Sequence, residues 1–97
     1  MLNASNDSDS VATKAGSGVR YVLPQRVHTD ANKEVSLFLR VTQPYGKVQF
    51  TVKSGDTVLM TAKRLRAAPG EMEKLTLKPE MLADLTEEIL VYLEERT

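Results

Sequence analysis

The side chains that could take part in acid–base chemistry are few in this sequence. The single histidine, His28, precedes a polar segment, residues 29–32, that has the composition of a loop. A general base needs a second group that orients it, and no neighbouring residue supplies one. We therefore interpret His28 as a surface loop residue and predict no catalytic residue in this chain.

Two pairs of acidic residues could share a proton: Glu71 with Glu73, and Glu87 with Glu88. Acid–base work requires two carboxylates in one cleft with separated pKa values. Residues 71 and 73 would share one face of a strand, and we expect that face to be exposed to solvent. The chain has no cysteine, so thiolate chemistry is excluded, and one histidine cannot build a histidine-based metal site. We predict no metal site and no cofactor in this chain.

Phosphate and nucleic-acid binding are also disfavoured. Gly16 and Gly18 form a G-x-G, but we expect no strand before them, and no third glycine follows at the required spacing. Thirteen Lys and Arg balance thirteen Asp and Glu, which removes the long-range attraction to nucleic acid or anionic lipid. No apolar run is long enough for a membrane helix. We predict no nucleic-acid partner, no membrane and a cytoplasmic location.

Contact with another protein is the kind of function that remains for these residues. Phe38 is predicted on the polar face of a strand, between Ser36 and Arg40, and exposed aromatic residues beside arginine are frequent in interfaces. The alternative is that the N-terminal segment, residues 25–28 or a second sheet covers Phe38. The basic run 63–66 is interpreted as a solvated strand end whose charges discourage edge-to-edge pairing. The candidate interface residues are Phe38, Arg40, Arg64 and Arg66.

The elements that would position these residues begin after an N-terminal arm. Residues 1–18 are rich in Ser, Asn, Asp and Gly and contain no aromatic residue. Such a segment buries too little apolar surface to offset the entropy of ordering it. We predict a flexible arm or linker over residues 1–18 and one folded domain over residues 19–97.

From residue 19 onward, apolar and polar residues alternate with the period of two that is typical of half-buried strands. Residues 35–41 and 48–53 show it most clearly. Turn residues at 43–46 and 54–56 predict a three-stranded antiparallel meander over residues 34–65, with a bulge in the third strand. Pro24 predicts an edge strand before it that kinks or changes sheet, with pairing resumed at residues 25–28.

Residues 71–77 are predicted as a strand with Leu75 and Leu77 inward, followed by one or two helical turns from Pro79. Residues 86–95 are predicted as a last strand that is covered on both faces or central. Six or seven strands with one short helical crossover indicate an all-β, immunoglobulin-like antiparallel sandwich. The cysteines and tryptophan of true immunoglobulin domains are missing, so the likeness is to the architecture. A small barrel is the alternative.

Three stretches carry a resemblance to a known family: V-R-Y-V-L-P-Q-R-V (19–27), V-S-L-F-L-R-V (35–41) and A-P-G-E-M-E-K-L-T-L (68–77). They resemble the C-terminal domain of bacterial FAD-dependent oxidoreductases of the pyridine nucleotide-disulfide class. The glycine-rich turns and redox cysteines of that family's catalytic domains are absent here, so no catalytic residue is carried over. The resemblance implies a non-catalytic accessory domain that docks on a flavoprotein body or subunit, which would hold the FAD.

The alternative function is a free-standing immunoglobulin-like module that binds a protein or a glycan through the loops at one end of the sandwich. An enzyme acting on its own is the least favoured of the three.

Overall fold

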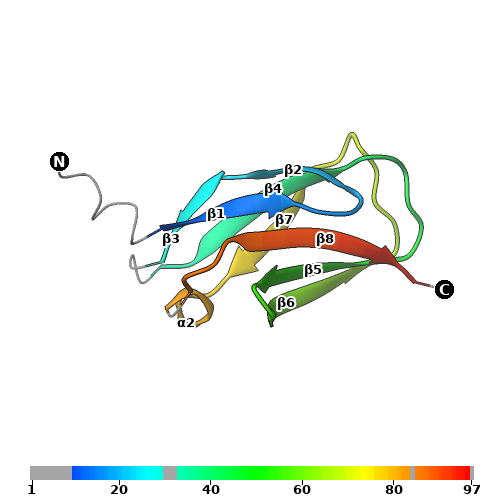
Figure 1. Cartoon of the computed structure of the whole chain (residues 1–97). Coiled ribbons are helices and arrows are strands. Elements are labelled where there is room, and N and C mark those ends of the chain that lie inside the picture. The colour runs from blue at the N-terminus through cyan, green and yellow to red at the C-terminus, as the bar shows by residue number, and fades with distance from the viewer. Residues whose placement is uncertain (1–9, 30–32, 84, 97) are drawn as a thin grey trace.

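Two β-sheets make up the described part of the chain, residues 10–29, 33–83 and 85–96, in the computed structural model (Figure 1). The smaller sheet has the order β2-β4-β7 and the larger has the order β3-β1-β8-β5-β6. The strands are β1 (Ser10–Ala15), β2 (Val19–Leu23), β3 (Arg26–His28), β4 (Val35–Val41), β5 (Val48–Ser54), β6 (Thr57–Arg64), β7 (Glu73–Leu77) and β8 (Ile89–Glu95). The helix α2 (Pro79–Leu82) connects β7 to β8. The predicted all-β class is confirmed.

The core lies between the two sheets, because each strand points one set of alternate side chains toward the other sheet. From the small sheet, β4 contributes Leu37 and Leu39, which are fully buried. From the large sheet, Phe50 of β5 and Val91 of β8 are also fully buried. The predicted inward positions of Leu75 and Leu77 are confirmed, and so is the central place of β8, which pairs with β1 on one side and β5 on the other.

The β5–β6 hairpin follows the predicted turn at residues 54–56. Gly55 occupies the left-handed region there, with φ of 57°. The predicted bulge is present as a register shift between Val52 and Lys53 of β5, so Leu59 of β6 has no residue directly opposite it. Because of this shift, Val58 is exposed while Met60 and Ala62 pack against the core.

The predicted meander is wrong at its first turn. Strand β4 belongs to the small sheet and β5 to the large one, so residues 42–47 cross between the sheets and do not form a hairpin. The crossing is held by Tyr45, whose backbone N–H donates to the carbonyl of Ala67 at 2.8 Å and whose carbonyl accepts from the Ala67 N–H at 3.0 Å. Turn residues mark a reversal of direction, and an arch between sheets requires the same residues as a hairpin.

The structure also differs from the predicted arm over residues 1–18. Residues 10–15 form strand β1, which pairs with β3 in antiparallel fashion and with β8 in parallel fashion. Val11 in this strand is buried. The strand is ordered by backbone hydrogen bonding to the free side of β8. Its own sequence, with Val11 as the one large apolar residue, does not indicate this pairing. Residues 1–9 lie outside the described residues, and the described part contains eight strands where six or seven were predicted.

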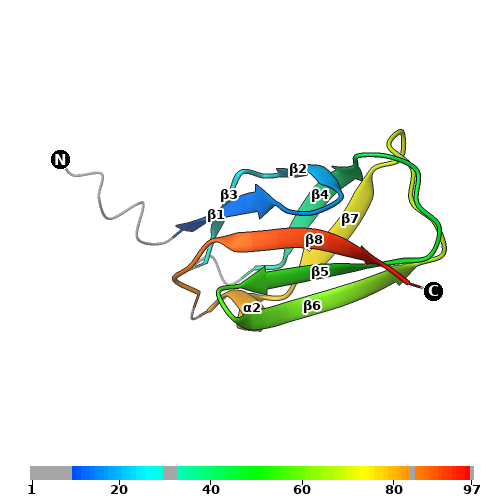
Figure 2. The ribbon, with the colours of Figure 1, turned by 45° about the vertical axis from the view of Figure 1, so that its right-hand side comes forward.

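The predicted change of sheet at Pro24 is confirmed, since β2 lies in the small sheet and β3 in the large one. Thr13 of β1 fixes this corner: its N–H donates to the carbonyl of Gln25 at 2.9 Å, and its hydroxyl donates to the carbonyl of Pro24 at 2.6 Å. In Figures 1 and 2 the chain passes from β2 in the small sheet to β3, which lies beside β1 in the large sheet. The predicted start of the helix at Pro79 is confirmed as well.

Candidate functional site

The outward side of the small sheet carries the candidate interface residue Phe38. We call this surface the β2–β4–β7 face. It is formed by the side chains that alternate with the core residues on the three strands. Its members are Tyr21, Leu23, Ser36, Phe38, Arg40, Lys74 and Thr76.

Phe38 lies at the centre of the β2–β4–β7 face, on the middle strand. Leu23 of β2 is directly opposite it on one side and Lys74 of β7 is opposite it on the other. The side chain of Phe38 is 37% exposed and that of Leu23 is 44% exposed. Phe38 points away from the large sheet. A second sheet was one of the predicted covers of Phe38, and the large sheet does not cover it. The two side chains form an apolar pair on an otherwise polar surface.

The rest of the face is polar and positively charged. Arg40 is half-buried and donates from Nη1 to the carbonyl of Pro69 at 3.3 Å, which ties the loop before β7 to the sheet. The hydroxyl groups of Ser36 and Thr76 lie 3.4 Å apart across β4 and β7. With Lys74, the face carries two cations and no acidic side chain among the members defined above. A surface of this kind fits an apolar protein patch with acidic groups at its rim.

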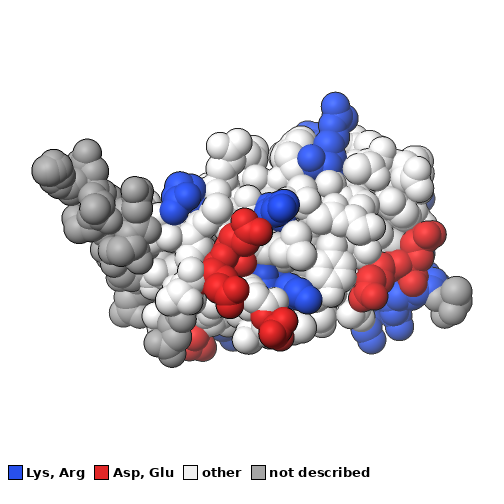
Figure 3. All heavy atoms as spheres, viewed as in Figure 1, with Lys and Arg blue, Asp and Glu red and all other residues white. Residues whose placement is uncertain are grey.

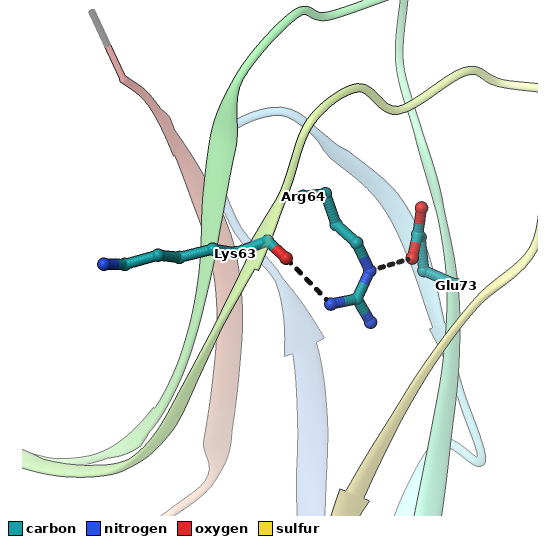
Figure 4. A network of polar contacts seen from close by, with 3 residues as sticks. All are labelled: Lys63, Arg64 and Glu73. Atoms are coloured by element: carbon teal, nitrogen blue, oxygen red, sulfur yellow. Dashed lines mark hydrogen bonds and ion pairs between the residues drawn. The ribbon is translucent and has the colours of Figure 1, made fainter.

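Arg64, a second candidate interface residue, is engaged within the protein (Figure 4). Its Nε donates to Oε1 of Glu73 at 2.9 Å, and its Nη1 donates to the carbonyl of Lys63 at 3.0 Å. The side chain of Glu73 is only 12% exposed, while that of Arg64 is 35% exposed. The ion pair joins the edge strand β6 of the large sheet to β7 of the small one.

The prediction of a solvent-exposed face for Glu71 and Glu73 is therefore wrong for Glu73. Leu75 and Leu77 point into the core, and Glu73 shares their parity on β7, so it points inward too. It lies at the end of the strand, where Arg64 supplies the opposite charge. The alternation that predicts inward positions for Leu75 and Leu77 also predicts an inward position for Glu73. Glu71 lies before β7 and is exposed.

The remaining candidates from the sequence lie apart from this face. Arg66 is exposed in the segment after β6, and His28 is exposed at the end of β3. Strand β1 does precede Gly16 and Gly18, contrary to the prediction, but β2 follows them in place of a helix. Gly18 has φ of 80°, and a Cβ built on it would lie 2.5 Å from Cγ of Leu93. These glycines are needed for the close packing of the β1–β2 turn against β8.

The described residues contain no group of three His, Cys, Asp or Glu that could hold a metal ion, and their surface has no pocket. No helix within residues 10–29, 33–83 and 85–96 is long and apolar enough to cross a membrane. Acidic and basic side chains are interspersed on the side of the molecule that Figure 3 shows, with uncharged surface between them. This matches the balanced net charge of the sequence.

Comparison with protein-family models, with curated proteins and with solved structures found no match for this chain.

Proposed function

We propose that this protein is a non-catalytic accessory domain with an immunoglobulin-like sandwich, which docks through the β2–β4–β7 face on the body of an FAD-dependent oxidoreductase. The observation that carries the proposal is the exposed apolar pair of Leu23 and Phe38 at the centre of a cationic face. Large apolar side chains at neighbouring positions of an open sheet face offer apolar area that a protein partner can bury.

The strand order supports the immunoglobulin-like part of the proposal. In such domains the second and fifth strands share one sheet while the third and sixth share the other. Here β4 and β7, which share the small sheet, correspond to the second and fifth strands of such a domain. Strands β5 and β8, which share the large sheet, correspond to its third and sixth. The β5–β6 hairpin and the short helix α2 before β8 also fit that connectivity. Strand β1 occupies the side of β8 where the last strand of such a domain would pair, but it runs parallel to β8.

The flavoprotein part of the proposal is supported by where the family resemblance falls. The stretch 35–41 coincides with β4, the stretch 68–77 ends with β7, and the stretch 19–27 contains β2. All three strands of the small sheet are thus included, together with residues 26 and 27 of β3, while β1, β5, β6 and β8 are not. A docking role for the β2–β4–β7 face explains why the resemblance concentrates there.

The test is affinity capture from an extract of the source cells with the unmodified protein and two variants. Each variant replaces exposed apolar side chains with serine. Leu23→Ser with Phe38→Ser removes the apolar pair, whereas Val58→Ser removes a similarly exposed apolar side chain from β6. We expect the unmodified protein and Val58→Ser to retain a protein that contains FAD. The Leu23→Ser/Phe38→Ser variant should bind it at least about tenfold more weakly, as central apolar residues of interfaces do.

Retention of the flavoprotein by the Leu23→Ser/Phe38→Ser variant would contradict the role of the face. Capture of a protein or glycan without flavin would favour the free-standing binding module, whose contacts would then lie in the loops. Circular dichroism of both variants serves as the folding control, because each substituted side chain is already exposed by more than a third.

A further inference from the structure

Strand β6 forms an open edge of the five-stranded sheet and is the longest strand in the described part of the chain (Figure 2). Its first six residues, 57–62, contain no charged residue and no proline. Proteins usually protect such an edge, because its free backbone groups can pair with a strand of another chain. The bulge lies near the start of β6, and the pairs from Met60 to Arg64 with β5 are regular.

The other sheet edges are better protected. Strand β3 is only three residues long and exposes Arg26 and His28. Strand β2 is followed at once by Pro24, and it lies against β1. Strand β7 is five residues long and begins with the ion-paired Glu73. An edge that is both long and uncharged over most of its length is therefore found at β6.

The two most exposed large apolar side chains in the described residues flank this edge. Val58, near the start of β6, is 54% exposed, and Leu65, directly after its end, is 82% exposed. In a pair of antiparallel β6 strands the start of each strand lies beside the end of the other. Val58 of one copy and Leu65 of the other would then approach each other, and a two-fold axis would create this contact twice.

The charged residues at the two ends of β6 also favour antiparallel pairing. Asp56 lies at the start, in the turn where the carboxylate of Glu87 packs against Gly55. The basic residues Lys63 and Arg66 lie at the end and are exposed. Antiparallel pairing of two copies brings the acidic start of each strand beside the basic end of the other. Parallel pairing would bring like charges together, which disfavours it.

We propose that two copies of this chain associate through β6, antiparallel about a two-fold axis, so that their five-stranded sheets join into one continuous sheet. The surface is separate from the β2–β4–β7 face, so it leaves that face free for the proposed docking. Lys63 and Arg66, which discourage indiscriminate pairing of the edge, select the antiparallel partner with Asp56.

The first experiment is sedimentation of the full chain from micromolar to millimolar concentration. We expect a concentration-dependent monomer–dimer equilibrium. Val58→Lys with Leu65→Lys should weaken it at least about tenfold, since four like charges are added along the joined edges. The control, Leu23→Ser with Phe38→Ser, should leave the equilibrium unchanged. A wild-type protein that stays monomeric throughout, or a dimer that responds to the control and not to the edge variant, overturns the proposal.

The second experiment uses the charge pattern and needs two variants that each fail to self-associate. Asp56→Lys places lysine beside the basic end of a second copy, and Lys63→Glu with Arg66→Glu places glutamate beside its acidic start. Each variant alone should be monomeric. An equal mixture of the two should form a heterodimer, because all facing ends then carry opposite charges. A mixture that remains monomeric contradicts antiparallel pairing through β6.

Amide hydrogen exchange supplies a readout that does not depend on any substitution. On raising the concentration of the unmodified protein, exchange at the β6 amides that face away from β5 should slow at least about threefold, while exchange in β3 should not change. Equal slowing in every strand would mean that dimerisation proceeds by another route, and it overturns the proposal.

Discussion

The two phenylalanines of this protein lie on two strands that have the same length and are each paired on both sides. Phe50 is on β5 and points into the core, where it is fully buried. Phe38 is on β4 and points outward, where it is 37% exposed. The outward side of β5 carries Thr51, which is 3% exposed although it faces away from the core. The large sheet thus covers the small outward side chain of Thr51, whereas the small sheet leaves the large outward side chain of Phe38 exposed.

This difference separates side chains that hold the fold from those available to a partner. On β5 the outward Thr51 lies between Tyr92 of β8 and Thr61 of β6, which stand directly opposite it. On β4 the outward Phe38 lies between Leu23 and Lys74, which are themselves exposed and leave it 37% exposed. Equal position along a central strand therefore does not imply equal burial, because the neighbouring strands decide what is covered.

The largest expected effect comes from the phenylalanines themselves. Phe50→Ala should lower the free energy of unfolding by about 3–5 kcal/mol, because it removes a fully buried ring and leaves a cavity. Phe38→Ala, the matched control, should lower it by about 1–2 kcal/mol, because more than a third of that residue is already exposed to water and no closed cavity is left. Urea unfolding measures both values, and similar losses for the two variants would contradict the comparison.

The next effect concerns Gly18, at the turn that brings β1 against β8. Gly18→Ala should cost about 2–3 kcal/mol in unfolding free energy, because the residue has φ of 80° and its Cβ would meet Leu93. Gly46→Ala is the control, since its new Cβ meets no atom within 4 Å and no unusual φ is required there. Thermal unfolding should show a lower midpoint for the first variant, and a stable Gly18→Ala would mean that the turn can relax.

A smaller effect is expected on the outward side of the large sheet. Tyr92→Ala should uncover Thr51 and cost about 1–2 kcal/mol, because a half-buried aromatic side chain is lost beside it. Thr61→Ala, on the other side of Thr51, should cost about 0.5 kcal/mol or less, because Thr61 is exposed. Chemical unfolding of the two variants measures the difference. An equal effect of both would show that Tyr92 does not provide the cover.

Much of the local structure could be predicted from the sequence. The alternation over residues 35–41 corresponds to β4, and the turn at 54–56 joins β5 to β6. Alternation reports which side chains share a face, since successive side chains on a strand point to opposite sides. It does not report which strand lies alongside, and for that reason the sheet change between β4 and β5 was missed.

Two further differences have the same physical origin. Residues 10–15 contain only one large apolar side chain, Val11, and so do not indicate a strand. Strand β1 is ordered by the hydrogen bonds that the free side of β8 offers. Glu73 was expected in solvent because charged residues usually are, yet Arg64 reaches it from the opposite sheet. Both depend on contacts between strands that do not pair as a hairpin: β1 with β8, far apart in the sequence, and β6 with β7, which lie in different sheets. The outward position of Phe38 needed only the alternation of its own strand.

The parallel pairing of β1 with β8 has a mechanical consequence. The two strands run in the same direction, and the start of β1 and the end of β8 lie at opposite ends of the molecule (Figure 1). A pull on these two ends acts along the strands, so their shared hydrogen bonds are loaded in shear and must break together. We expect the domain to resist stretching between neighbours attached before β1 and after β8 more strongly than its modest size would suggest, as force spectroscopy along that axis would measure.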